Sequence, residues 1–299
     1  GLEIIGIVKE VGKNVEIFKE LDMVVVNNYV NSCKKCKKCN TGNYNNCENG
    51  AISMYGCCNK YNENLPEFLK NTDGGFSQII TVDQDFVYKI IDNELGINLT
   101  EIVPMTSSGL AVYSPLKKFM KVSDKVGIIG LGGLGHLGVK LAIELGGNVT
   151  VFSQSEWKRD PSLLDLLAHS FINTETENFE HENNSFDLLL NTIPYDHDIS
   201  KYVNLLKDDG KLVMLGLPKS DKKIKESKYE IKNREIVKSF LGSTDELDEL
   251  IDLSLEKNIF ADVEIVNYDR INHAVSNILT NNVKFKYVLD VTSLQLINN

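Results

Sequence analysis

The sequence predicts an α/β protein that combines a mostly β domain with a parallel, doubly wound sheet. The pattern of apolar residues changes along the 299 residues and supports this prediction. Short β-rich runs separated by Gly, Asn and Asp turns fill residues 1–107, whereas apolar strands alternate with helical stretches over residues 108–243. A tail over residues 244–299 returns to a mixture of helix and strand. A chain of this length accommodates about two domains with a full core.

The first region is expected to contain four short strands and little helix. Its β-rich runs are Ile4–Val8, Met23–Val26, Ile79–Val82 and Phe86–Ile90. A cluster of cysteines interrupts these strands and is expected to form a separate lobe.

The second region contains six apolar runs of strand length. They are Val126–Ile129, Val149–Phe152, a weaker run near Phe171, Phe186–Leu190, Leu212–Leu215 and Ile236–Leu241. Between the first two runs, apolar residues recur from Leu134 to Leu145 with the spacing of one buried helix face. Strands that alternate with helices predict a six-stranded parallel sheet that is doubly wound.

The tail is expected to begin with a helix from Asp245 to Lys257, since Ser243 and Glu246 are placed as a capping box. The remaining elements are a strand over Val263–Val266, a helix over Asp269–Leu279 and a strand over Phe285–Val291.

Composition narrows the choice of partner. The net charge of −10 argues against nucleic acid and anionic membrane surfaces, which need basic residues, and favours a small molecule. The sequence shows no secretory leader and no apolar run near the ~20 residues of a membrane helix, so a cytoplasmic protein is expected. The chain starts at Gly1 without an initiator Met, and we expect a leading segment to be missing.

Four cysteines, spaced Cys33-x-x-Cys36-x-x-Cys39-x7-Cys47, predict one closed, structural Zn²⁺ site. Surface cysteines or two disulfides are the alternative, but a disulfide framework belongs to small secreted chains. Lysines between the sulfurs could offset the negative charge of a four-thiolate centre; they are Lys34, Lys35, Lys37 and Lys38. A closed site leaves no position for substrate, so the chemistry is expected elsewhere.

The glycine-rich turn predicts a dinucleotide site, because it follows a strand and opens the periodic helix. It consists of Gly130, Leu131, Gly132, Gly133, Leu134 and Gly135. Gly130 permits the tight turn, Gly132 lets the backbone approach a pyrophosphate, and Gly135 lets the helix pack closely on the strand. Glycines that serve helix packing alone are the alternative.

The end of the second strand favours NADP over NAD. An acidic residue at that point would bind the ribose of NAD, but here donors and positive charge follow the strand, from Ser153, Ser155, Lys158 and Arg159. In the alternative, Glu156 binds the ribose and the two cations form a solvated face.

The order of these features gives the chain a family resemblance. With the β region, the cysteine lobe and the Gly130–Gly135 turn, it resembles the zinc-dependent medium-chain alcohol dehydrogenases, and within them the cinnamyl alcohol dehydrogenase branch. Matching stretches include residues 3–12, Gly74-Gly75-Phe76-Ser77, residues 112–117, Asn191-Thr192 and residues 286–290. The resemblance implies a split catalytic domain folded like GroES, a Rossmann domain that binds NADP, and a homodimer with continuous cofactor sheets. It also implies structural zinc at the four cysteines and adds Thr192 and Gly216 to the cofactor site.

The second, catalytic zinc of that family is where the sequence departs. The family's ligands are a Cys in the leading segment, the His of Gly-His-Glu and the Cys of Pro-x-x-Cys-x-Gly. Here the second motif reads Gly1-Leu2-Glu3 and the third places Ser107 at the Cys position. Leucine has no donor atom, and a serine hydroxyl is a poor zinc ligand beside a thiolate. Glu3 is retained but cannot hold zinc alone.

Three functions remain open from the sequence. The first is an NADP-dependent zinc alcohol dehydrogenase that interconverts primary alcohols and aldehydes, with cinnamyl-type substrates among the candidates. The second is a metal-free NADPH-dependent reductase that polarises its substrate by hydrogen bonds. The third is an NADP(H)-binding protein without turnover.

Overall fold

The structure is a computed structural model that describes residues 1–26, 28–61, 70–90, 98–216, 234–239, 241–280 and 282–297. The chain divides into two compact units. Unit 1 comprises Gly1–Leu110 with Leu241–Asn299, and unit 2 comprises Ala111–Phe240. The chain therefore leaves unit 1, builds unit 2 and returns. The boundaries expected from the sequence, after residues 107 and 243, each differ from these by three residues.

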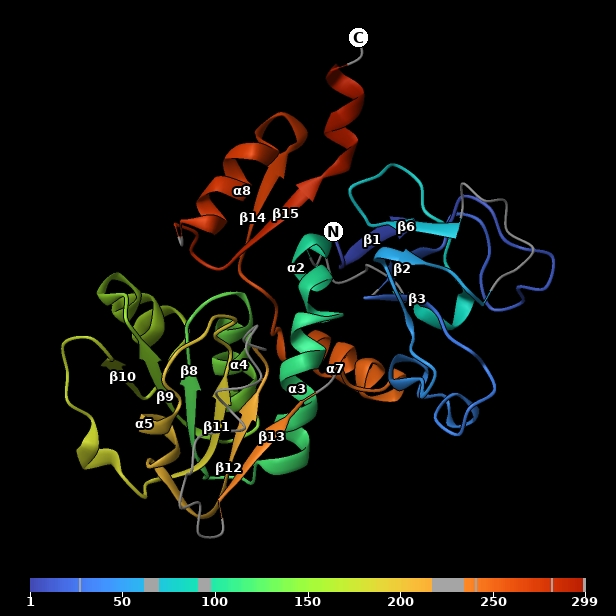
Figure 1. Cartoon of the computed structure of the whole chain (residues 1–299). Coiled ribbons are helices and arrows are strands. Elements are labelled where there is room, and N and C mark those ends of the chain that lie inside the picture. The colour runs from blue at the N-terminus through green and yellow to red at the C-terminus, as the bar shows by residue number, and fades with distance from the viewer. Residues whose placement is uncertain are drawn as a thin grey trace. The chain divides into compact units, whose positions relative to one another are not determined.

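Unit 2 is built on a six-stranded sheet in which every neighbouring pair is parallel (Figure 1). The strands are β8 (Lys125–Ile129), β9 (Asn148–Ser153), β10 (Ser170–Asn173), β11 (Phe186–Asn191), β12 (Leu206–Met214) and β13 (Glu235–Lys238). Their order, β10-β9-β8-β11-β12-β13, confirms the predicted doubly wound sheet. The winding reverses between β8 and β11, so the carboxyl ends of these strands form the switch point where ligands bind in such sheets.

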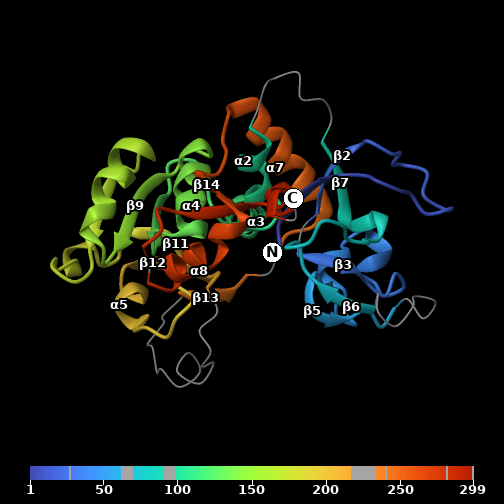
Figure 2. The ribbon, with the colours of Figure 1, turned by 90° about the horizontal axis from the view of Figure 1, so that it is seen from above.

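Helices cover both faces of this sheet. They include α4 (Gly133–Glu144) and α5 (Ser200–Val203), with short helical turns η5 (Glu156–Lys158), η6 (Pro161–Asp165) and η7 (Glu180–Glu182). Gly138 of α4 faces Ile128, whereas Tyr202 of α5 packs with Ile129, whose side chain points to the opposite face of β8. Seen from above, α4 and α5 accordingly lie on opposite faces of the sheet (Figure 2). The helix predicted between the first two strands is thus confirmed.

The core of unit 2 is centred on Phe152 of β9, which is fully buried. Its ring makes edge-to-face contacts with Phe179, Phe186 and Tyr202, at centroid distances of 5.6, 5.5 and 5.8 Å. Such aromatic pairs contribute beyond the area they bury. The cluster makes the strand that precedes Ser153 a firmly held element.

Unit 1 contains a three-stranded antiparallel sheet and three further two-stranded pairings. The sheet has the order β1-β2-β7, from Ile4–Ile7, Met23–Val26 and Val87–Lys89. The paired strands are β3 (Tyr29–Asn31) with β4 (Ile52–Ser53), β5 (Tyr55–Cys58) with β6 (Asn71–Asp73), and, in parallel, β14 (Val263–Asn267) with β15 (Lys286–Asp290). Its described helices are α2 (Leu99–Ile102), α3 (Ser108–Phe119, which continues into unit 2), α7 (Thr244–Lys257) and α8 (Ile271–Leu279). Short helical turns are η1 (Cys39–Thr41), η2 (Tyr44–Asn46), η3 (Gln84–Phe86), η4 (Val103–Met105), η8 (Tyr268–Arg270) and η9 (Val291–Ile297).

One expected strand is absent from unit 1. Residues Ile79–Val82 are described but form no ladder. Ile80 and Val82 instead pack against a cluster that includes Val30 and Met54. The alternation of apolar side chains therefore reflects packing of an extended segment without strand pairing, and the strand prediction was wrong.

The return of the chain to unit 1 is well defined. Ser243 accepts a hydrogen bond from the backbone N–H of Glu246, whose carboxylate accepts one from the backbone N–H of Ser243, so the predicted capping box at the start of α7 is confirmed. Just before it, the backbone carbonyls of Leu241 and Gly242 accept hydrogen bonds from the side-chain amides of Asn46 and Asn45, at 3.1 and 2.9 Å. The cysteine lobe thus holds the returning segment.

Candidate cofactor and metal sites

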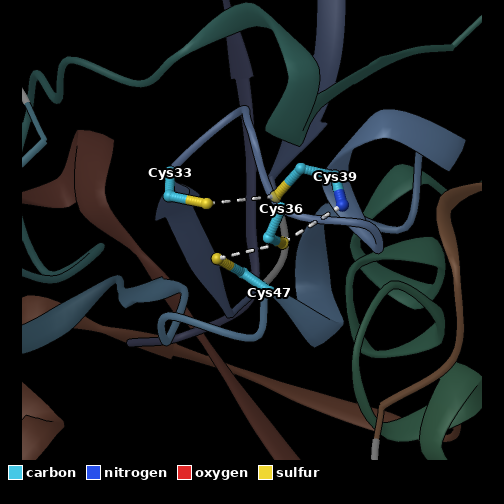
Figure 3. A group of neighbouring side chains, drawn as sticks. All are labelled: Cys33, Cys36, Cys39 and Cys47. Atoms are coloured by element: carbon cyan, nitrogen blue, oxygen red, sulfur yellow. Dashed lines mark hydrogen bonds between the residues drawn. The ribbon is translucent and has the colours of Figure 1, made fainter.

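The four cysteines of the lobe converge on one point (Figure 3). The Sγ atoms of Cys33, Cys36, Cys39 and Cys47 all lie within 4.8 Å of one another. The Cys33–Cys39 and Cys36–Cys47 pairs are 3.9 and 4.0 Å apart, too far for a disulfide and close to the ~3.8 Å edge of a tetrahedron with Zn–S bonds of ~2.3 Å. Backbone N–H groups of Cys39 and Glu48 both point at Cys36 Sγ, at 3.4 Å. The residues present therefore fit a four-coordinate zinc ion.

The protein environment treats the thiols unequally when no cation is present. The pKa of Cys33 is lowered to about 6, mainly by the backbone N–H of Lys35 and then by the amide of Asn49. Burial raises the pKa of Cys39 to about 12. A divalent cation would reverse this second shift, because a coordinated thiol loses its proton. The buried Cys39 thus depends most on the metal for its charge.

Lys34 does not serve the sulfurs as expected. Its ammonium group contacts Asp83 at 2.7 Å and Asp85 at 2.5 Å and lies over the Tyr44 and Phe86 rings. Its positive charge is therefore committed to carboxylates, and the prediction that it offsets the thiolates was wrong. The structure instead gives it the task of fastening the lobe to η3.

The glycine-rich turn has the geometry of a dinucleotide cradle. Gly130 has a φ of +89°, which a side chain would strain, directly after β8. A Cβ on Gly135 would lie 2.1 Å from the carbonyl oxygen of Gly130, so the first turn of α4 touches the end of the strand. A Cβ on Gly132 would meet nothing within 4 Å. The open space beside Gly132, at the start of a helix, suits a pyrophosphate.

Thr192 and Gly216 build the neighbouring strand ends. The Thr192 hydroxyl contacts the carbonyl oxygens of Ile129 and Gly130, at 3.0 and 2.9 Å, and so holds the turn from below. Gly216 leaves room for the carbonyl of Ile193, which a Cβ would approach to 2.1 Å. Through these contacts Thr192 and Gly216 support the glycine-rich turn. Direct contact of either residue with the cofactor stays a prediction.

The residues after β9 divide into two groups. At the end of β9 the Ser155 N–H donates to Ser153 Oγ at 3.3 Å, and Lys158 reaches the turn, where its Nζ donates to the Leu131 carbonyl at 2.7 Å. Lys158 is only 4% exposed, and burial lowers its pKa. Its ammonium therefore lies at the glycine-rich turn itself.

Arg159 turns to acidic partners. Its Nε donates to Glu156 Oε1 at 2.5 Å, its Nη2 to Glu177 Oε1 at 2.5 Å, and its Nη1 to the Phe171 carbonyl at 3.1 Å. Asn173, at the end of β10, donates to the other oxygen of Glu156 at 2.7 Å. Glu177 and Asn173 were not foreseen as members of this site, although the place of Asn173 at the end of the third strand could have indicated it.

Glu3 and Lys286 form an internal ion pair beside the positions to which the resemblance assigns the second zinc. Glu3 Oε1 accepts the Ser108 N–H at 2.8 Å, and Glu3 Oε2 accepts Lys286 Nζ at 2.5 Å. Lys286 also donates to Ser108 Oγ, while the Ser107 hydroxyl donates to Asn28 Oδ1 at 2.8 Å. Leu2 offers no donor atom. These residues do not fit a metal ion, and among the described residues only the cysteine quartet forms a metal-type group.

A doubly wound sheet with an open glycine cradle, joined to a β unit with a four-thiol lobe, defines a dinucleotide-dependent dehydrogenase of the zinc-containing class. Two family profiles match the chain: the alcohol dehydrogenase GroES-like domain over residues 1–92 and the zinc-binding dehydrogenase over residues 133–256.

Individual relatives agree with these profiles. A probable cinnamyl alcohol dehydrogenase from Nicotiana tabacum is 35% identical, over 99% of this chain and 81% of the relative. The structure of a cinnamyl alcohol dehydrogenase from Sorghum bicolor superposes with a TM-score of 0.88 at 30% identity, over 98% of this chain and 81% of the other. One from Helicobacter pylori, complexed with NADP(H), gives a TM-score of 0.82 at 32% identity with the same coverage. The chain belongs to the zinc-dependent alcohol dehydrogenase family and is similar to its cinnamyl alcohol dehydrogenase branch, which confirms the resemblance inferred from the sequence.

Proposed function

We propose that this chain binds NADP(H) at the Gly130–Gly135 turn, holds one structural zinc in its cysteine lobe, and interconverts a primary alcohol and its aldehyde. The observation that carries the proposal is the open space at Gly132, directly beside the buried ammonium of Lys158. A negative pyrophosphate is favoured there by helix-end N–H groups and by the lysine. The bound nicotinamide would supply or accept the hydride.

Ser153 and Ser155 support the choice of NADP. Their hydroxyls lie at the carboxyl end of β9, where NAD-dependent relatives of this fold present an acid to the ribose. Hydroxyl groups can donate to a 2′-phosphate, which a free carboxylate would repel. The Helicobacter pylori relative, whose structure is complexed with NADP(H), agrees with this assignment.

A second candidate function is NADP(H) binding without zinc-assisted turnover, either as a metal-free reductase or as a catalytically silent member of the family. The specific observation that favours it is the Glu3–Lys286 ion pair, with Leu2 and Ser107 beside it. Lewis-acid polarisation lowers a barrier by several kcal/mol, so its loss would cost orders of magnitude in rate.

Two measurements on the purified chain separate the candidates. About two zinc ions per chain would support the zinc alcohol dehydrogenase, whereas about one, lost when the four cysteines are replaced, would support the second candidate. NADPH oxidation is then followed with cinnamaldehyde and a panel of aliphatic aldehydes. Turnover with one zinc supports a metal-free reductase, and NADPH binding without turnover supports the silent member.

We further propose a homodimer that works in the cytoplasm. The family resemblance supports the homodimer, and β13 forms an outer edge of its sheet, where a second copy could continue the ladder. None of the described helices has the length and apolar composition to cross a membrane. Light scattering of the purified chain would test the dimer.

A further inference from the structure

Beyond the serines and Lys158, a second layer of residues surrounds the cofactor-selecting end of β9. We propose that Arg159 and Asn173 determine the preference for NADP over NAD by occupying and neutralising the carboxylate of Glu156. The inference rests on the proposed binding of NADP(H). It gives Arg159 a positioning role in place of direct contact with the 2′-phosphate.

Glu156 is the one acidic residue between the end of β9 and Lys158, and it would bind a ribose if its oxygens were available. A carboxylate offers about four acceptor positions. Arg159 Nε takes Oε1 at 2.5 Å, and Oε2 receives Asn173 Nδ2 at 2.7 Å and Arg159 Nη2 at 3.3 Å. Little acceptor capacity is left for the two hydroxyls of a ribose.

The partners of Glu156 are themselves held in place. Asn173 is only 3% exposed, its side-chain oxygen accepts the Glu175 N–H at 3.0 Å, and its own N–H donates to Glu177 Oε1 at 3.0 Å. The Arg159 guanidinium lies 4.7 Å from the centre of the Phe171 ring and donates to the Phe171 carbonyl. A planar guanidinium fixed on several sides loses less entropy on pairing than a mobile surface cation.

The charges agree with this arrangement. The hydrogen bonds from Arg159 and then from Asn173 lower the pKa of Glu156, which agrees with an ionised, paired carboxylate. A paired carboxylate repels a 2′-phosphate less than a free one. Lys158, which contacts Leu131 and not Glu156, remains the cation available on the cofactor side.

The test compares NADPH and NADH dissociation constants of the full chain by fluorescence titration. Arg159→Met removes the pairing and should lower the preference for NADPH by about tenfold or more, since the freed carboxylate can accept hydrogen bonds from the ribose of NADH and repels the 2′-phosphate of NADPH. Adding Glu156→Gln to Arg159→Met should restore it, because the liberated charge is gone. Glu156→Gln alone should leave the preference within about threefold of the wild-type value.

Three further variants serve as tests and controls for the role of Arg159. Asn173→Ala should shift the preference in the same direction as Arg159→Met, and Arg159→Lys, which keeps the charge, should shift it less. Arg270→Met, a control arginine in unit 1, should have no effect on the preference. Melting temperatures identify variants that fail to fold. If Arg159→Met is one of them, Asn173→Ala and Arg159→Lys test the inference in its place.

Each outcome has one meaning. If Arg159→Met lowers NADPH affinity and Glu156→Gln does not restore it, the lost preference does not come from the carboxylate of Glu156 and the inference is overturned. An unchanged preference in both Arg159→Met and Asn173→Ala also overturns it, while the proposed function stands. A wild-type chain that binds neither dinucleotide overturns the proposed function and the inference with it.

Discussion

Two glycines of the same turn should respond oppositely to the same added methyl group. In Gly132→Ala the new Cβ enters open space, and the extended backbone at this position, with φ −123° and ψ −151°, does not require glycine. In Gly135→Ala the Cβ would lie 2.1 Å from the Gly130 carbonyl oxygen, far inside ordinary contact distance. The first change should therefore affect only ligand binding, and the second should affect folding.

The magnitudes follow from these contacts. Gly135→Ala forces the strand end and the helix apart by more than about 1 Å; overpacking of this kind costs about 1–3 kcal/mol, and a domain of this size should lose about 2–12 °C in melting temperature. Gly132→Ala should melt at or slightly above the wild-type temperature, because alanine restricts the unfolded chain. Its NADPH affinity should fall about tenfold to a hundredfold, as one phosphate contact is lost.

Thermal melting with and without NADPH tests both glycines. Ligand at about 100 times its dissociation constant stabilises a protein by about 2.7 kcal/mol, and at the same NADPH concentration this gain should fall to about 0.4–1.4 kcal/mol in Gly132→Ala. Gly6→Ala, whose Cβ also meets nothing within 4 Å, is the matched control and should keep the gain. A Gly132→Ala chain that retains full stabilisation by NADPH would show that the cofactor does not cross this turn.

Four other changes have defined outcomes. Cys39→Ser should release the zinc and lower the melting temperature; unchanged metal content would contradict the tetrahedral site. Lys158→Glu should weaken NADPH more than NADH binding in titrations, and equal losses would confine the lysine to the pyrophosphate that both cofactors share and exclude a 2′-phosphate role. Phe152→Ala should cost about 3–5 kcal/mol in urea unfolding, as it removes a fully buried ring with three aromatic partners; a loss below 1 kcal/mol would be inconsistent with that packing. Asp22, paired with Lys89 at 2.9 Å, has a lowered pKa, so its contribution to stability is present above the ordinary aspartate pKa and is lost as the pH falls below about 4; Asp22→Asn should flatten the acid limb of the stability profile.

Features that depend on local sequence were predictable. The parallel strands were predicted from continuous apolar runs, since both faces of such strands are buried. Helix α4 was predicted from its single apolar face. The glycine-rich turn and the four cysteines could be recognised because the residues of each site lie close together in the sequence. The capping box before α7 likewise involves residues only three apart.

Features that depend on distant partners were not predictable. Glu3 and Lys286 are 283 positions apart, and nothing in either neighbourhood indicates that they meet. The sequence shows the positive charge of Arg159, and we therefore expected it to bind phosphate. It does not show that Arg159 pairs with the carboxylate of Glu177, which lies beyond the next strand. The apolar alternation at Ile79–Val82 is equally compatible with strand pairing and with packing of an extended segment, and only the fold decides.

The hydrogen bonds from Asn45 and Asn46 to the returning backbone have a consequence for the order of assembly. The lobe is made early in the chain, and the segment it holds is made after about 190 further residues, once unit 2 is complete. A lobe already closed by its metal would offer these two amides in fixed positions as the late segment arrives. Zinc bound during synthesis would then fold the cysteine lobe before residues 241–242 are made. In a chain made without zinc, the lobe would be unfolded when this late segment has to bind it.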